Sequence, residues 1–137
     1  MNITSFLDQH KGAAEIVGQI ESHISSGSVG DPSAVRTLLS SLVGKLSIHL
    51  AMEDKNIYPK AAVSDNAELK AMSARLQTEM SGLADVLKSY SGKWSNASDI
   101  SASQSEFIAE TKGIVSALKN RISVEERDFY PLVEKYL

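Results

Sequence analysis

Cysteine is absent from the chain. Disulfide bonds, iron–sulfur clusters and thiol catalysis are therefore excluded, because each of them needs a cysteine sulfur. The absence is also typical of proteins that work in a reducing compartment, so the sequence predicts a cytoplasmic location.

Long apolar runs and basic clusters are missing as well. No stretch approaches the roughly 20 apolar residues that a membrane-spanning helix needs, and the opening MNITS lacks the basic and apolar regions of a signal peptide. With 14 Lys and Arg against 17 Asp and Glu, the chain offers no basic face for nucleic acid. Phosphate-binding glycine loops and a Ser-His-Asp order are not found either. We therefore expect no membrane association, no nucleic-acid binding, and neither nucleotide nor acyl-transfer chemistry.

What remains is the composition of an ordinary globular domain, and we predict a single domain over residues 1–137. Apolar residues recur at spacings of three and four and no long stretch alternates with period two, which predicts an all-α protein. Short links between long helices favour an antiparallel up-down-up-down four-helix bundle made of two hairpins, about 5–63 and 67–137. The four helices are expected from about Ser5 to Ile24, from Pro32 to about Tyr58, from about Ala67 to Tyr90, and from about Ser98 to the C-terminus.

One segment of the second helix is repeated, with changes, in the fourth. Residues 46–59 read LSIHLAMEDKNIYP, and residues 118–131 read LKNRISVEERDFYP. At this constant offset Glu53 aligns with Glu125, and a Tyr-Pro pair ends both copies; Pro59 is expected to kink or end its helix. One difference is informative, because His49 of the first copy is replaced by Arg121 in the second.

Three side chains of the first hairpin have the spacing of metal ligands. His49 and Glu53 are four residues apart and therefore lie one above the other on the same helix face, in line with core leucines. His10 lies on the inward stripe of the first helix. When the two hairpins are aligned, the position of His10 is occupied by Met80 in the second.

These residues, together with the trailing Tyr58-Pro59, make nearly the whole chain resemble a hemerythrin-like domain of the HHE cation-binding type. The resemblance implies a four-helix bundle with two non-haem irons, each held by histidines from one hairpin, and carboxylates of the second and fourth helices bridging them. Carried over to this chain, one half-site is complete, with His10 and His49 as histidines and Glu53 and Glu125 in the bridging positions. The other half-site has Met80 and Arg121 where its histidines are expected.

Two interpretations follow from this difference. In the first, the protein holds at most one non-haem iron, or a similar divalent ion, at His10, His49, Glu53 and Glu125, and acts in oxygen, nitric oxide or iron handling or sensing. In the second, the centre is metal-free, Arg121 replaces the charge of the metal, and the bundle is a binding or regulatory module. Oxygen or nitric oxide is the expected small ligand in the first case. An enzymatic role is not favoured, because nothing in the sequence defines a substrate pocket.

The neighbouring polar and apolar residues are given structural roles. Glu79 and His23 are expected at the surface, and Met80 is expected to fill the apolar space that a histidine would have left. Tyr58 and Tyr130 are expected to close one end of the core with their hydroxyls, with contact to a metal ligand as the alternative.

Overall fold

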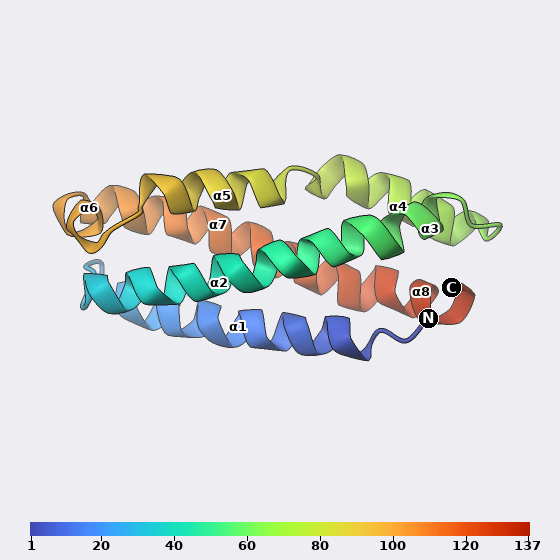
Figure 1. Cartoon of the computed structure of the whole chain (residues 1–137), viewed down its shortest axis with the longest axis horizontal. Coiled ribbons are helices and arrows are strands. Elements are labelled where there is room, and N and C mark those ends of the chain that lie inside the picture. Colours follow the sequence, from blue (N-terminus) through green and yellow to red (C-terminus); the bar gives the residue numbers. More distant parts are fainter.

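The computed structural model describes all residues, 1–137, and every element in it is helical. Figure 1 shows the helices aligned along one long axis, with α1 beside α2 and with the N- and C-terminal ends of the chain at the same end of the molecule. None of these helices is long and apolar enough to cross a membrane. The elements are α1 (Thr4–Ile24), α2 (Pro32–Met52), η1 (Glu53–Ile57), α3 (Tyr58–Ala62), α4 (Ala67–Met80), α5 (Leu83–Lys93), α6 (Ala97–Ala102), α7 (Gln104–Val124), η2 (Glu125–Phe129) and α8 (Tyr130–Tyr136).

Side chains of the connecting segments begin three of these helices. Asp31 accepts a hydrogen bond from the backbone of Ala34 and is followed by a proline in the first turn of α2. Asn66 and Asn96 cap α4 and α6 in the same way. These caps satisfy N–H groups that have no partner within the helix, and they fix where each helix starts.

Two π-helical turns, η1 and η2, each begin at a glutamate and precede a Tyr-Pro pair. In both, the N–H of the tyrosine bonds the carbonyl five residues earlier, Tyr58 to Glu53 and Tyr130 to Glu125. The proline that follows has no N–H to give to the usual partner four residues earlier, and the wider turn accommodates it. Pro59 therefore does not end the helix, which continues through α3.

The predicted third helix is interrupted in its middle. α4 ends at Met80, Gly82 adopts a left-handed conformation with φ of 85°, and α5 begins at Leu83. The apolar stripe passes across this break with unchanged spacing, so the sequence pattern gave no sign of it. A second interruption, at Ser103, separates the short α6 from α7.

The apolar core consists of two clusters with a polar layer between them. One cluster of 19 buried residues includes Leu46 and Leu118, and the other, of 10 buried residues, includes Ile57 and Phe129. Along the chain, His49 and Glu53 lie between Leu46 of the first cluster and Ile57 of the second. Arg121 and Glu125 lie in the same way between Leu118 and Phe129. The polar layer is formed by His10, His49, Glu53, Arg121 and Glu125, all buried.

Candidate metal centre

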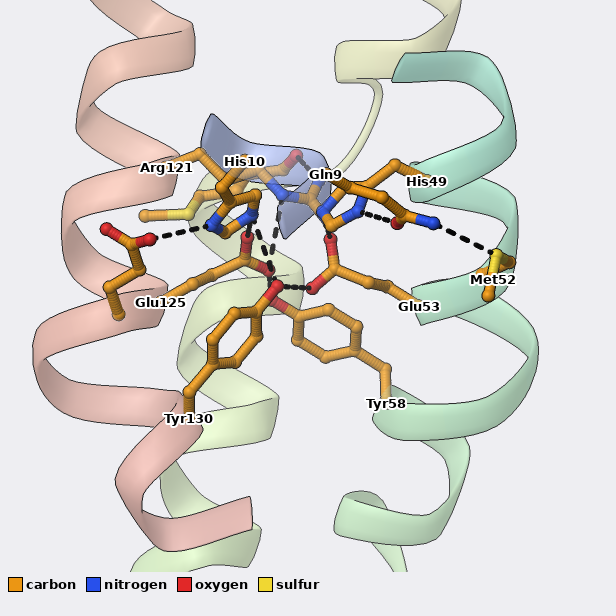
Figure 2. A network of polar contacts seen from close by, with 11 residues as sticks. Gln9, His10, His49, Met52, Glu53, Tyr58, Arg121, Glu125 and Tyr130 are labelled. Carbon is orange, nitrogen blue, oxygen red and sulfur yellow. Dashed lines mark hydrogen bonds and ion pairs between the residues drawn. The ribbon is translucent and has the colours of Figure 1, made fainter. Parts of the chain in front are cut away.

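The fold brings the four proposed ligands to one point in the core. His10 comes from α1, His49 from the end of α2, and Glu53 and Glu125 from the first positions of the two π turns. Each of the four offers one ligand atom, and these atoms all lie within 4.8 Å of one another. Figure 2 shows the two histidines on one side of the carboxylates and two tyrosines on the other.

His49 is held with one ring nitrogen free for a ligand. Its Nδ1 lies 2.5 Å from Oε1 of Gln9, whose amide nitrogen donates to the sulfur of Met52 at 3.6 Å. Since the amide oxygen can only accept, Nδ1 carries the proton and Nε2 has an unprotonated lone pair. Nε2 in turn lies 2.6 Å from Oε1 of Glu53. Two acceptors at this distance must share a proton or a cation.

His10 is held from two sides. Its Nε2 lies 3.2 Å from Oε1 of Glu125 and 3.2 Å from the hydroxyl of Tyr130, and its ring stacks on that tyrosine at 5.2 Å. Its Nδ1 lies 3.4 Å from a carboxylate oxygen of the exposed Glu126. The two atoms are close without forming a hydrogen bond, so the ring of His10 is held mainly by Tyr130 and Glu125.

A tyrosine holds one oxygen of each buried carboxylate. Tyr58 donates to Oε2 of Glu125 at 2.8 Å, and Tyr130 donates to Oε2 of Glu53 at 3.0 Å. Burial and the adjacent carboxylates raise the pKa of both phenols, so they remain protonated donors. The hydroxyls thus bond the candidate ligands themselves, the alternative that the sequence had left open. The Oε1 atom of each glutamate faces a histidine instead, His49 for Glu53 and His10 for Glu125.

Arg121 lies beside the two glutamates as the second interpretation requires. Its guanidinium nitrogens are 3.5 Å from Glu125 and 3.7 Å from Glu53, and a third contact reaches the backbone carbonyl of Met80 at 3.4 Å. Burial opposes its charge, but the carboxylates and Tyr58 outweigh burial and raise the pKa of the guanidinium. Arg121 is therefore a permanent positive charge in this layer.

The protonation states follow from burial and from the contacts just described. Burial raises the pKa of Glu53 to about 10, with the adjacent Glu125 adding to the shift. Burial alone would also raise the pKa of Glu125, but hydrogen bonds from His10 and Glu53 and the charge of Arg121 hold it at about 2. Burial lowers the pKa of His49 to about 4. At neutral pH and without metal, a protonated Glu53 therefore shares its proton with His49, while Glu125 pairs with Arg121.

The unsatisfied atoms of this layer fit a metal ion. Oε1 of Glu53, Oε1 of Glu125 and Nε2 of His49 are all buried, their polar neighbours are members of the same layer, and they converge on the same point. Two imidazole nitrogens and two carboxylate oxygens form a donor set suited to a divalent transition metal. A cavity of about 10 Å³ lies against His10, His49 and Glu125, which is room for one water-sized ligand.

The second half-site offers no comparable donors. Arg121 occupies it as a cation, and Met80 is half-buried beside the break after α4. Met80 packs against the second apolar cluster and also lines a pocket that is open beside Arg121. Glu79 is exposed, 3.9 Å from Arg75, and His23 is half-buried away from the layer.

Sequence reasoning did not single out Gln9 and Glu126. Each directly adjoins a predicted ligand in the sequence, Gln9 before His10 and Glu126 after Glu125. Each contacts a histidine from another helix, so only the polar side chains of Gln9 and Glu126 could have suggested from the sequence that they contact the candidate ligands.

An all-helical fold with a buried layer of two histidines and two carboxylates defines the class: a helical protein with a core able to hold a cation. The profile of one family, described as hemerythrin HHE cation-binding domain, matches residues 1–133. The chain belongs to this family. Comparisons with curated proteins and with solved structures gave no match.

Proposed function

We propose that the protein holds one divalent non-haem metal ion, iron in the first place, with His10, His49, Glu53 and Glu125 as its ligands. The observation that carries this proposal is the 2.6 Å contact between two buried acceptors, Nε2 of His49 and Oε1 of Glu53. A cation at this point would satisfy both. The family's antiparallel up-down-up-down bundle, as a single domain over residues 1–137, is the architecture we propose around the site.

Arg121 limits the centre to one ion. A second metal in the family's other half-site would meet a buried guanidinium instead of a histidine, and like charges at such distances repel strongly in a protein interior. We therefore expect at most one metal per chain.

Iron held by these two imidazoles and two carboxylates would supply chemistry with oxygen or nitric oxide. The chain's own residues bury that site and fix its groups: Gln9 orients the imidazole of His49, the ring of Tyr130 stacks on His10, and the two tyrosine hydroxyls orient the carboxylates. We propose a cytoplasmic role in oxygen, nitric oxide or iron handling or sensing rather than catalysis.

A metal-free module is the second candidate, and one observation favours it. With Glu53 protonated and Glu125 paired with Arg121, the layer carries no net charge and needs no ion. In that case Arg121 performs the charge compensation that metals perform in the rest of the family.

Metal titration of chelator-treated protein under anaerobic conditions separates the two candidates. We expect wild type to bind ferrous iron at one ion per chain, and His49→Ala to lose that binding because a ligand and the anchor for Gln9 disappear together. His23→Ala is the matched control, since this chain's third histidine lies outside the layer, and it should bind iron as wild type does. No binding by wild type would establish the metal-free module, and two ions per chain would contradict the role given to Arg121.

A further inference from the structure

A pocket opens at the break between α4 and α5 and leads to the buried polar layer. Its volume is about 270 Å³, and Arg121 lies among the residues that line it. Apolar side chains form most of the remaining wall, among them Leu50, Leu76, Met80 and Leu83, and the exposed Asp54 is also one of the lining residues.

Arg121 separates this pocket from the candidate metal site. It lines both the pocket and the inner cavity of about 10 Å³, together with Leu50 and Leu83. Its side chain, which Figure 2 shows reaching in from α7, is only 9% exposed. Its contacts are long, at 3.4 to 3.7 Å, and its Nε has no hydrogen-bond partner. The guanidinium therefore has N–H donors that the protein itself does not satisfy.

The backbone around the pocket also favours a negative charge. α5 begins at the pocket with no side chain capping it, and its first residues, Leu83 and Ala84, line the wall. Free N–H groups and the helix dipole attract anions at such an end. The buried arginine and the uncapped helix start thus face the same space.

From this juxtaposition we propose that the pocket binds a small carboxylate with a short apolar chain. The carboxylate pairs with Arg121 and the chain lies against Leu50, Leu76 and Leu83. The planar guanidinium matches a carboxylate in shape, and the apolar wall gives the tail a place to be buried.

Binding in the pocket is coupled to the metal site, and this part rests on the proposed function. Without metal, Arg121 is the counter-charge of Glu125. When the two carboxylates ligate a divalent ion, they no longer need the positive charge of Arg121. The divalent ion, the two carboxylates and Arg121 together then carry one net positive charge. A pocket carboxylate neutralises it, so metal should tighten carboxylate binding, and carboxylate should tighten metal binding by the same factor.

Calorimetric titration with butyrate tests the proposal on chelator-treated protein and on protein loaded with zinc, a redox-inert divalent ion. We expect butyrate to bind both forms, more tightly when zinc is present, and more tightly than acetate, which lacks the tail. Arg121→Gln should weaken butyrate at least about tenfold, because a charge-assisted pair is lost. The matched control is Arg127→Gln, which removes an exposed arginine and should change nothing.

A second pair of variants avoids the buried layer. Ala84 is exposed and lines the pocket, so Ala84→Glu should weaken butyrate and Ala84→Lys should strengthen it. The same changes at the exposed Ala74, outside the pocket, should have no effect.

Absence of butyrate binding in both forms, or equal binding by Arg121→Gln, would overturn the pocket. Equal affinity with and without bound zinc would overturn the coupling. Failure of wild type to bind metal would overturn the proposed function instead; butyrate binding that depends on Arg121 would then still support the pocket.

Discussion

At the scale of single residues, the contact between Nε2 of His49 and Oε1 of Glu53 determines whether the buried layer holds a proton or a metal ion. The proton on Nδ1 of His49 is fixed by Gln9, so Nε2 meets Glu53 as an acceptor. A proton or a metal ion resolves this contact, and the two exclude each other. Metal binding is therefore expected to release the proton of Glu53, as ligands generally lose protons on metallation.

Arg121 is the residue on which the metal-free layer depends. Arg121→Ala in chelator-treated protein should lower the free energy of unfolding by about 3–5 kcal/mol at pH 7, because the buried carboxylate of Glu125 loses its only cation. A carboxyl that takes up a proton in the folded variant has its pKa above the unfolded value, so the deficit should shrink as pH falls toward about 4.5. Urea denaturation at pH 7 and pH 5 measures both effects.

The control for this variant is Arg127→Ala, an exposed arginine paired only with its neighbour Asp128. It should change stability by less than about 0.5 kcal/mol. Wild-type stability of metal-free Arg121→Ala at pH 7 would show that the carboxylates need no counter-charge.

At the scale of helical elements, departures from the regular α-helix position the site. The π turns place Glu53 and Glu125 at the layer and turn Tyr58 and Tyr130 toward the opposite carboxylate. π turns of this kind are often found at functional sites. The break after Met80 has a different consequence, because it opens the pocket beside Arg121.

The break depends on a glycine, and glycine substitutions test it. Gly82 has φ of 85°, so Gly82→Ala should destabilise the protein by about 1 kcal/mol, although its added methyl would meet no atom within 4 Å. Gly113 lies within α7 with equal free space, and Gly113→Ala should stabilise by up to about 1 kcal/mol. Chemical denaturation compares the two variants. Equal effects at both positions would show that the left-handed turn is not required.

At the scale of the whole molecule, the buried layer controls how stability depends on pH. In metal-free protein the pKa values of His49 and Glu125 are lowered, so both residues contribute stability that is lost as pH falls. The contribution of His49 is lost from pH 6.5 toward about 4, and that of Glu125 from pH 4.5 toward about 2. The raised pKa of Glu53 acts in the opposite direction. The contribution of Glu53 to stability is fully present below pH 4.5 and is lost as pH rises toward about 10. Between 4.5 and 6.5 the effects of His49 and Glu53 oppose each other.

Metal-free protein should therefore be most stable between about pH 4.5 and 6.5 and should weaken above that range, by up to about 1.4 kcal/mol per pH unit. Urea denaturation from pH 4 to pH 9 measures the curve. Glu53→Gln should flatten the alkaline side, because the amide resembles the protonated acid, whereas Glu79→Gln, at an exposed position, should retain it. A stability that rises from pH 6.5 to pH 9 would contradict the protonated Glu53.

The sequence by itself determined the helical class, the family and the inward direction of the stripes. These features are local, because periodicity of three and four residues sets which face is apolar, and the repeat of residues 46–59 at 118–131 carries the pattern of the ligands. The interpretation of Arg121 as a cation near Glu125 also followed from a one-turn spacing on one helix, and its expected place opposite Glu53 followed from the two glutamates facing each other in the bundle. The family assignment is confirmed by the match over residues 1–133.

Only the tertiary structure decided which side chains complete the layer and where it opens. Gln9 reaches His49 and Tyr130 reaches Glu53 across separations of 40 and 77 residues, which no spacing along one helix encodes. The break at Gly82 leaves the apolar stripe intact, so periodicity could reveal neither the break nor the pocket that Met80 lines beside it. Contacts between helices depend on how each turn is wound, and that winding is set by packing and by backbone hydrogen bonds more than by the order of apolar residues.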